Sequence, residues 1–279
     1  MTLIVRPGFA YDTDASNYID AVEAADQADT PGIGAMETGV RYAINDFVIG
    51  CKNDGVWTAL KNSCILAGAK TLEGSFIDLK SCTKVLTNNN FADGTYSGSN
   101  YTTGDYNRKT GLVGDATTKY LNSNRNNNAD PQNSQHLSAY VTEQPDPTGS
   151  VNRAYLGTNW GLSGSSVIGR SGTTARAMYA EMRYGTEFVG GTASATTGFF
   201  GASIGSSSTF SVRYSGTAAN QLSTSATPRN ENINVFRNGG GSVYTANRLA
   251  FYSIGESLNL ALLDARVSAL ITAFGVAIP

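Results

Sequence analysis

The sequence predicts a mainly β protein, an antiparallel jelly-roll β-sandwich with an N-terminal helical unit and a C-terminal helix. Between residues 136 and 236, short apolar segments recur about every ten to fifteen residues and are separated by turn residues. Glycine accounts for 31 of 279 residues and charged residues for only 15 %, which favours many short strands joined by tight turns. The chain also closes on a strand that runs directly into a helix, at residues 248–271.

Residues 1–14 are predicted to form an extended arm, because Pro7 and Gly8 exclude a helix there. The arm is more apolar than a free tail requires, and its apolar residues are Leu3, Ile4, Val5, Phe9 and Tyr11. We expect these residues to bind a partner, with the arm docked on another subunit. The alternative is that the arm covers its own domain.

Residues 15–63 are predicted to form a helical unit. Behind a cap at Thr13 or Asp14, the first helix has apolar residues at helical spacing, namely Ala15, Tyr18, Ile19 and Val22. The same spacing predicts a second helix over residues 36–51. A short third segment carries Trp57, Leu60 and Cys64, and we assign Trp57 to the packing of this unit.

Residues 64–279 are predicted to form the jelly-roll domain with its terminal helix. The expected strands are short apolar runs at residues 65–67, 75–79, 136–142, 153–157, 166–169, 177–180, 198–202, 209–214, 233–236 and 248–255. Polar runs at residues 87–105 and 122–131 are predicted loops. Asn259 is the expected cap of the closing helix and Gly275 its expected end. Its apolar face is expected to pack against the N-terminal helices or the sandwich.

Composition argues against several classes of function. The net charge is −2 and no basic cluster is interleaved with aromatic residues, so nucleic-acid binding is not expected. The sequence has no run of about 18 apolar residues, and its start lacks the basic and apolar regions of a signal peptide. We therefore expect no membrane insertion. We expect the chain to be made in a cytoplasm. Cys51, Cys64 and Cys82 form no CxxC motif and are expected to be buried free thiols.

Catalytic chemistry has few candidate residues. His136 is the only histidine, and its place at the start of a predicted strand favours a structural residue at a strand edge or interface. Glu181 and Glu187 come nearest to a glycosidase pair, but a continuous strand would hold them about 20 Å apart. A turn at Tyr184 and Gly185 would bring them together. A surface hairpin with solvated charges is favoured, so we expect no enzymatic activity and no catalytic residue.

No cofactor or metal is expected, because one histidine cannot build a histidine-rich metal site. Calcium binding by loop oxygens stays open at four residues that more often cap turns, which are Asp93, Asn100, Asp105 and Asp115. Trp160 lies in a loop flanked by Gly157 and Gly161. An exposed Trp160 would be the best candidate for contact with a glycan or a partner, and core burial is the alternative.

Three parts of the sequence resemble a known family. They are residues 55–68, which contain a Gly-Val-Trp turn, residues 103–122 together with residues 136–141, and the closing strand and helix. Over residues 36–275 the chain resembles the concanavalin A-like, laminin-G-like jelly-roll domains of bacteriophage and cyanophage virion proteins. The resemblance implies a viral structural or attachment role, and it leaves the location on head or tail open.

We therefore expect a non-enzymatic virion structural protein, made in the host cytoplasm, that binds the capsid or tail through protein–protein contacts. A capsid decoration (cement) protein or short appendage fits better than a full-length fibre, because the sequence has no shaft repeat or heptad seam. The expected partners are other virion proteins and further copies of the chain, with a trimer as the expected oligomer. The alternative is a glycan-binding receptor-recognition module of a tail or head fibre.

Overall fold

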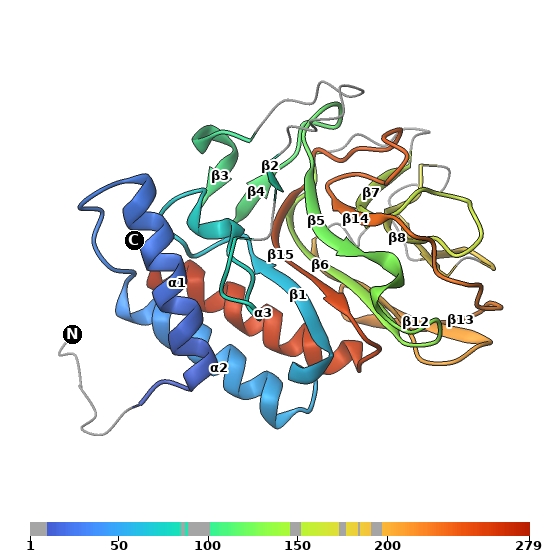
Figure 1. Cartoon of the computed structure of the whole chain (residues 1–279), viewed down its shortest axis with the longest axis horizontal. Coiled ribbons are helices and arrows are strands. Elements are labelled where there is room, and N and C mark those ends of the chain that lie inside the picture. The colour runs from blue at the N-terminus through green and yellow to red at the C-terminus, as the bar shows by residue number, and fades with distance from the viewer. Residues whose placement is uncertain are drawn as a thin grey trace.

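The computed structural model describes residues 10–84, 87–88, 101–145, 152–172, 177–183, 185–190 and 197–279. Within these residues two antiparallel sheets pack face to face, and three α-helices lie over the outer face of one sheet (Figure 1). The predicted fold class, a β-sandwich with an N-terminal helical unit and a C-terminal helix, is confirmed.

The first sheet has eight strands in the described part of the chain. They are β1 (Leu60–Ile65), β3 (Tyr106–Asn107), β4 (Gly111–Val113), β6 (Gln135–Glu143), β11 (Gly198–Ile204), β12 (Thr209–Tyr214), β13 (Thr217–Leu222) and β15 (Arg248–Gly255). The spatial order is β13-β12-β11-β6-β15-β4-β3, and β1 also pairs with β15. The last strand of the chain therefore lies inside the sheet, bonded to β1, β4 and β6.

The second sheet has seven strands in the same described ranges. They are β2 (Thr87–Asn88), β5 (Leu121–Asn126), β7 (Arg153–Gly157), β8 (Ser166–Arg170), β9 (Met178–Met182), β10 (Phe188–Gly190) and β14 (Asn232–Val235). Their spatial order is β10-β9-β8-β7-β14-β5-β2. The β9–β10 hairpin thus forms one edge of this sheet.

Alternating side chains from both sheets fill the space between them. In β12, Phe210, Val212 and Tyr214 are buried, whereas the residues between them are only half-buried. Ile168 and Ala180 of the facing sheet belong to the same apolar cluster. The alternation read from the sequence thus places one face of β12 in the core.

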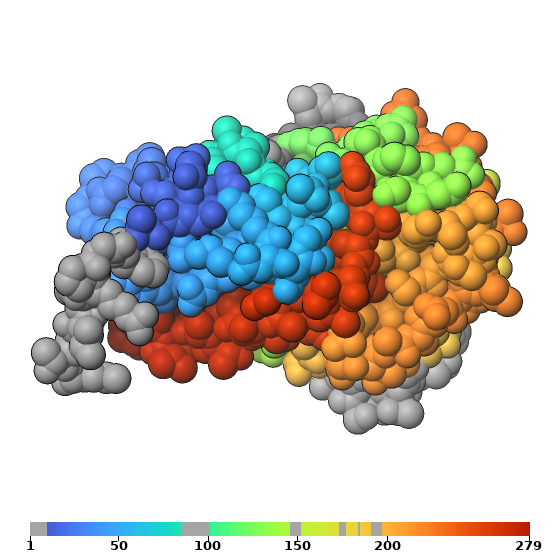
Figure 2. Space-filling model, turned by 90° about the horizontal axis from the view of Figure 1, so that it is seen from below, coloured from blue at the N-terminus to red at the C-terminus, as the bar shows by residue number. Residues whose placement is uncertain are grey.

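A layer of three helices covers the outer face of the eight-stranded sheet. They are α1 (Thr13–Asp29), α2 (Thr38–Asn53) and α3 (Leu260–Ala277). Phe199 of β11 and Phe251 of β15 join these helices to the sheet in a second apolar cluster. Figure 2 shows the red C-terminal segment lying along the blue helical unit.

The apolar face of α3 packs as expected, with Leu263, Val267 and Phe274 fully buried in the helical layer. By length and composition alone, α3 is the one helix in the described ranges that could cross a membrane. A core helix passes the same test, and here the apolar face of α3 covers α2 and the sheet.

Two helix boundaries differ from prediction. Asp12 caps α1, because its side chain accepts the backbone N–H of Asp14; neither Thr13 nor Asp14 is the cap. Asn259 caps α3 as predicted. The helix does not end at Gly275 but continues to Ala277, where the following residue, Ile278, is buried and anchors the last turn.

Two segments are wrong in the sequence-based prediction. The third helical segment is a 3-10 helix, η1 (Trp57–Ala59), followed by strand β1, because pairing with the distant β15 overrides the local spacing. The predicted boundary between residues 63 and 64 falls within β1. Residues 75–79 are not a strand. The 3-10 helix η2 (Gly74–Phe76) overlaps their start, Ile77 and Asp78 make only isolated bridges, and the Asp78 carboxylate closes the following turn.

Residues 122–131 are not an exposed polar loop. They continue β5 inside the seven-stranded sheet and then form the 3-10 helix η4 (Asn127–Ala129). The Asn127 side chain is buried, donates to the Gly164 carbonyl at 2.9 Å and accepts from the Gln135 amide at 2.9 Å. The fold therefore satisfies the buried Asn127 amide without water. Within residues 87–105, the described parts are β2, residues 101–102 and the 3-10 helix η3 (Thr103–Asp105).

Candidate functional site

Trp160 follows β7 on the outer face of the seven-stranded sheet. Its indole stacks on the ring of Tyr179 in β9, with ring centroids 3.9 Å apart and planes inclined by 30°. Tyr179 points outward, because its strand neighbours Met178 and Ala180 point into the core between the sheets. Trp160 is half-buried. Tyr179 therefore covers part of the indole, and another part remains accessible.

Two exposed aliphatic side chains flank this stacked pair. Leu162 follows Trp160 by two residues and is 39 % exposed. Val189 is the cross-strand partner of Tyr179 and is 38 % exposed. We call Trp160, Tyr179, Leu162 and Val189 the Trp160 platform. An accessible indole with aliphatic neighbours can stack on the apolar face of a sugar or on a partner's side chain.

Glu181 lies next to the platform, and Glu187 lies opposite Glu181. The pairing of Phe188 with Ala180 makes the two glutamates cross-strand neighbours in the β9–β10 hairpin. The chain reverses between these strands, so the 20 Å separation expected of a continuous strand does not apply. The fold thus adopts the alternative arrangement, in which a turn brings Glu181 and Glu187 together.

The Glu181 carboxylate is held from two sides. The Tyr179 hydroxyl donates a short hydrogen bond to Oε1, and the Gly161 backbone N–H donates to Oε2 at 3.2 Å. Burial raises the pKa of Glu181, and burial together with the charges of Glu181 and Glu187 raises the pKa of Tyr179. Glu181 is 0 % exposed. Its carboxylate orients Tyr179 and cannot reach a substrate on the surface in this conformation.

His136 is a buried structural residue in the middle of the eight-stranded sheet. Its Nδ1–H donates to the Glu256 carbonyl at 2.6 Å, and its Nε2 accepts from the Ser253 hydroxyl at 2.9 Å. Ser253 is in turn bonded to Ser138 at 2.7 Å. Burial lowers the pKa of His136 to about 4. The histidine lies on a central strand, not at the edge considered from the sequence.

The described calcium candidates use their carboxylates within the fold. Asp105 forms an ion pair with Lys119 at 2.6 Å. Asp115 accepts backbone N–H groups from Thr117, Thr118 and Lys119 at 2.8–2.9 Å, which lowers its pKa despite partial burial. Asp93 and Asn100 lie outside the described residues. No group of three His, Cys, Asp or Glu residues in the described ranges could hold a metal ion.

All three cysteines are free thiols, as predicted. Cys51 and Cys64 are buried as expected, whereas Cys82 is only half-buried. Burial raises the pKa of Cys51 to about 12, so its thiol stays protonated and unreactive at neutral pH.

The root of the arm is fixed to α2. The ring of Tyr11 stacks on that of Tyr42, with centroids 5.8 Å apart. The backbone N–H of Asp12 donates to Asn45 Oδ1 at 2.7 Å, and Lys52 Nζ donates to the Asp12 carboxylate at 2.6 Å. The other predicted contact residues of the arm lie outside the described residues, and they are Leu3, Ile4, Val5 and Phe9.

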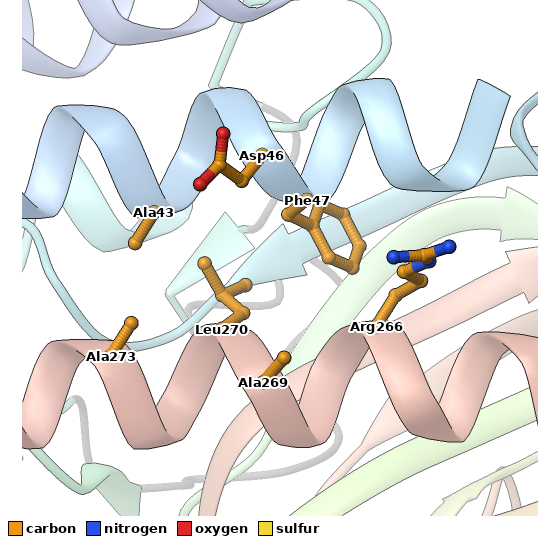
Figure 3. A pocket seen from close by; sticks show the side chains of 7 residues that line it. All are labelled: Ala43, Asp46, Phe47, Arg266, Ala269, Leu270 and Ala273. Atoms are coloured by element: carbon orange, nitrogen blue, oxygen red, sulfur yellow. The ribbon is translucent and has the colours of Figure 1, made fainter. Parts of the chain in front are cut away.

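A surface groove of about 140 Å³ lies between α2 and α3 (Figure 3). Its lining residues are Ala43, Asp46, Phe47, Arg266, Ala269, Leu270 and Ala273. Figure 3 shows Ala43 and Ala273 pointing toward one another from the two helices. Arg266 is bonded to Asp54 through two nitrogens, at 2.7 and 2.9 Å. We call this feature the α2–α3 groove.

The sequence interpretation missed Tyr179, Tyr42 and the α2–α3 groove. Tyr179 had a usable signal, because it alternates with the apolar residues Met178 and Ala180 in a predicted strand. The groove had none, because it depends on how two helices more than 200 residues apart in the sequence lie side by side.

No family model matches the chain, and a search of curated proteins found no match. Similar folds occur in the Trypanosoma rangeli sialidase solved with sialic acid (TM-score 0.47, 13 % identity, 76 % of this chain and 33 % of the sialidase chain). Domain 4 of AbnA, a GH43 extracellular arabinanase from Geobacillus stearothermophilus solved with arabinotriose, gives a TM-score of 0.43 at 11 % identity over 68 % of this chain and 92 % of that domain.

Domains LG4-5 of the mouse laminin alpha1 chain give a TM-score of 0.31 at 12 % identity, over 46 % of this chain and 36 % of that one. The chain spans only about a third of the sialidase and laminin structures. At such identities the likeness concerns the fold and no activity. Within the described residues the chain is an antiparallel β-sandwich with a helical layer over one sheet.

Proposed function

We propose that this chain is a non-enzymatic structural protein of a bacteriophage virion, which binds other virion proteins through its arm and helical layer. The observation that supports the proposal is the arm root. Tyr11 and Asp12 are fastened to α2 by a ring stack, a hydrogen bond and an ion pair. An apolar segment attached to a rigid body is a suitable anchor, because little further chain must be ordered on binding.

The active-site candidates add support by their burial. His136 and Glu181 are both 0 % exposed and are bonded within the sheets. His136 bonds β6 to β15, and Glu181 bonds its strand neighbour Tyr179 and the loop residue Gly161, so a structural role accounts for both residues.

The test is truncation of residues 2–9 in the chain supplied to assembling particles. We expect the truncated chain to keep its folded circular dichroism spectrum and unfolding midpoint but to be lost from purified particles. The matched control is Leu222→Ala, which removes an apolar side chain that is 75 % exposed at the other end of the molecule. Normal incorporation of a folded truncated chain would refute the arm as anchor.

Self-association belongs to the same proposal, with a trimer as the expected state. Light scattering coupled to size-exclusion chromatography measures it directly, because three copies of a 29.3 kDa chain differ clearly in mass from one or two. A monomer at every concentration tested would refute this part of the proposal.

A second candidate function is glycan binding at the Trp160 platform. The stacked, half-buried Trp160 beside two exposed aliphatic residues favours it. A glycan array probed with the folded protein and with Trp160→Ala tests it. Binding that is present in the first and lost in the second supports a recognition module, and an array without signal excludes one.

A further inference from the structure

The direction of the chain around α2 leads from Asp12 toward the α2–α3 groove. Viewed down the helix axis, successive residues turn by about 100°. Asn45, which binds Asp12, lies about 60° to one side of Tyr42, and Asp46 lies about 40° to its other side. Tyr11 stacks on Tyr42 itself. The contacts of Asp12 and then Tyr11 therefore step around α2 from the side of Asn45 toward the side of Asp46.

The groove is near enough for the arm to reach. Tyr42 and Asp46 are separated by about 6 Å along the helix axis. An extended chain advances about 3.3 Å per residue, so the segment between residues 6 and 11 spans up to about 17 Å. Residues 2–6 can therefore lie over the α2–α3 groove of their own chain.

The groove is apolar at its base and accepts an aliphatic side chain. Phe47 and Leu270 are buried in it, whereas Ala269 is exposed. Its volume of about 140 Å³ is close to the roughly 150 Å³ of an apolar cavity that holds a benzene molecule. The small alanine side chains on both helices leave this space. One side chain the size of leucine or isoleucine would fill it.

The charges at the groove also match the arm. Arg266 is neutralised by Asp54 in a two-nitrogen ion pair. Asp46 has no ion-pair partner in the described part of the chain, and its side chain is exposed. The arm carries three consecutive aliphatic residues, residues 3–5, followed by Arg6. Arg6 can therefore pair with Asp46 while an aliphatic neighbour enters the groove.

We propose that the α2–α3 groove is the seat of the chain's own N-terminal segment, residues 2–6, in the free subunit. The inference rests on the proposed function, because it describes where the anchoring arm is held before assembly. The seat covers aliphatic side chains that would otherwise face water, and assembly exchanges this contact for one with a virion partner. Attachment through Tyr11 gives the segment an effective concentration in the millimolar range at its seat.

Disulfide trapping tests the seat in the free, full-length protein. The variant carries Ile4→Cys and Ala269→Cys in a Cys82→Ser background, so that Cys51 and Cys64 are the buried thiols that remain. Ala269 is exposed, so its replacement leaves the fold intact. The control pairs Ile4→Cys with Ser208→Cys, an exposed position beyond β11. Non-reducing gels and mass spectrometry of the linked peptides give the readout.

We expect an intrachain disulfide between positions 4 and 269 that forms at least tenfold faster than the control disulfide. An interchain disulfide at the same positions would overturn the proposal, because a second copy's arm would then occupy the groove. Equal rates for the test and control pairs would overturn it as well.

A separate variant tests the proposed ion pair between Arg6 and Asp46. Asp46→Asn should slow formation of the 4–269 disulfide several-fold, whereas Asp20→Asn, an exposed charge removal on α1, should leave the rate unchanged. An equal rate in both variants would refute the pairing of Arg6 with Asp46. These readouts need no particle, so they are separate from the truncation test. A formed disulfide with normal incorporation of the truncated chain would refute the proposed function and leave the seat intact.

Discussion

The indole of Trp160 and the phenol ring of Tyr179 lie 3.9 Å apart, centroid to centroid, and the Tyr179 hydroxyl donates to the buried carboxylate of Glu181. The contact joins the loop after β7 to strand β9 on the outer face of the seven-stranded sheet. The half-buried Trp160 is therefore linked through Tyr179 to the buried Glu181 carboxylate. Removing the Trp160 side chain should affect both the stability of the protein and the environment of this carboxylate.

Trp160→Ala should lower the free energy of unfolding by about 2 kcal/mol, less than the 3–5 kcal/mol typical of a fully buried tryptophan. The variant loses the stacking contact and opens Glu181 to water. Urea denaturation measures the loss. Trp160→Phe is the matched control and should keep more than half of the unfolding free energy that Trp160→Ala loses. Equal losses in both variants would contradict a role for ring stacking.

Glu181 should make the protein less stable as the pH rises. Burial raises its pKa in the folded state, so the folded protein binds more protons than the unfolded chain between the two pKa values. Its favourable contribution is complete below the unfolded pKa, near 4.3, and is lost as the pH passes through the folded value. Relative to Glu181→Gln, wild-type stability should therefore fall on raising the pH through this range. Asp20→Asn, which removes an exposed charge on α1, should leave that pH dependence unchanged.

His136 should act in the opposite direction. Its pKa is lowered to about 4 in the folded protein, against about 6.5 in the unfolded chain. The unfolded chain binds the extra proton between these values, so stability is complete above pH 6.5 and falls as the pH drops toward 4. The expected loss is about 3 kcal/mol. Denaturation at pH 7 and pH 4 should show this loss in wild type and in Ser138→Ala, but not in His136→Gln.

Gly111→Ala should be far more destabilising than Gly216→Ala. Both glycines have positive φ angles, +97° and +83°, so both variants bear the same backbone strain of about 1 kcal/mol. A Cβ at Gly111 would also collide with the Leu249 carbonyl oxygen of β15, whereas nothing lies within 4 Å of one at Gly216. We expect an additional loss of about 2 kcal/mol or more from this collision. Similar unfolding midpoints for the two variants would show that β4 can move away from β15.

Local patterns predicted the elements whose packing is local. Helices α1 and α2 follow from apolar residues at helical spacing, and β12 follows from strict alternation of buried and half-buried residues. The spacing of Trp57, Leu60 and Cys64 misled, because β1 is buried along nearly all of its length by its pairing with β15. Such a strand shows no alternation.

The platform and the groove could be predicted only in part. Trp160 was identified from its glycine-flanked loop, but its stacking on Tyr179 depends on how β7 and β9 are placed in one sheet. Whether Glu181 lies opposite Glu187 could not be predicted, because it depends on where the chain reverses between β9 and β10. The polar segment after β5 was misjudged because the Asn127 side chain is buried by partners outside the segment. These are Gly164, 37 residues away, and Gln135 at the start of β6.

The interior position of β15 determines when the molecule can form during synthesis. This strand bonds to β1, β4 and β6, and its Phe251 pairs with Ile65 of β1, which lies far earlier in the sequence. A ribosome adds about 5–20 residues per second from the N-terminus, so the eight-stranded sheet lacks this strand until residues 248–255 have been made. The earlier strands must wait for the last one, and a chain released before residue 248 leaves an open gap in the sheet.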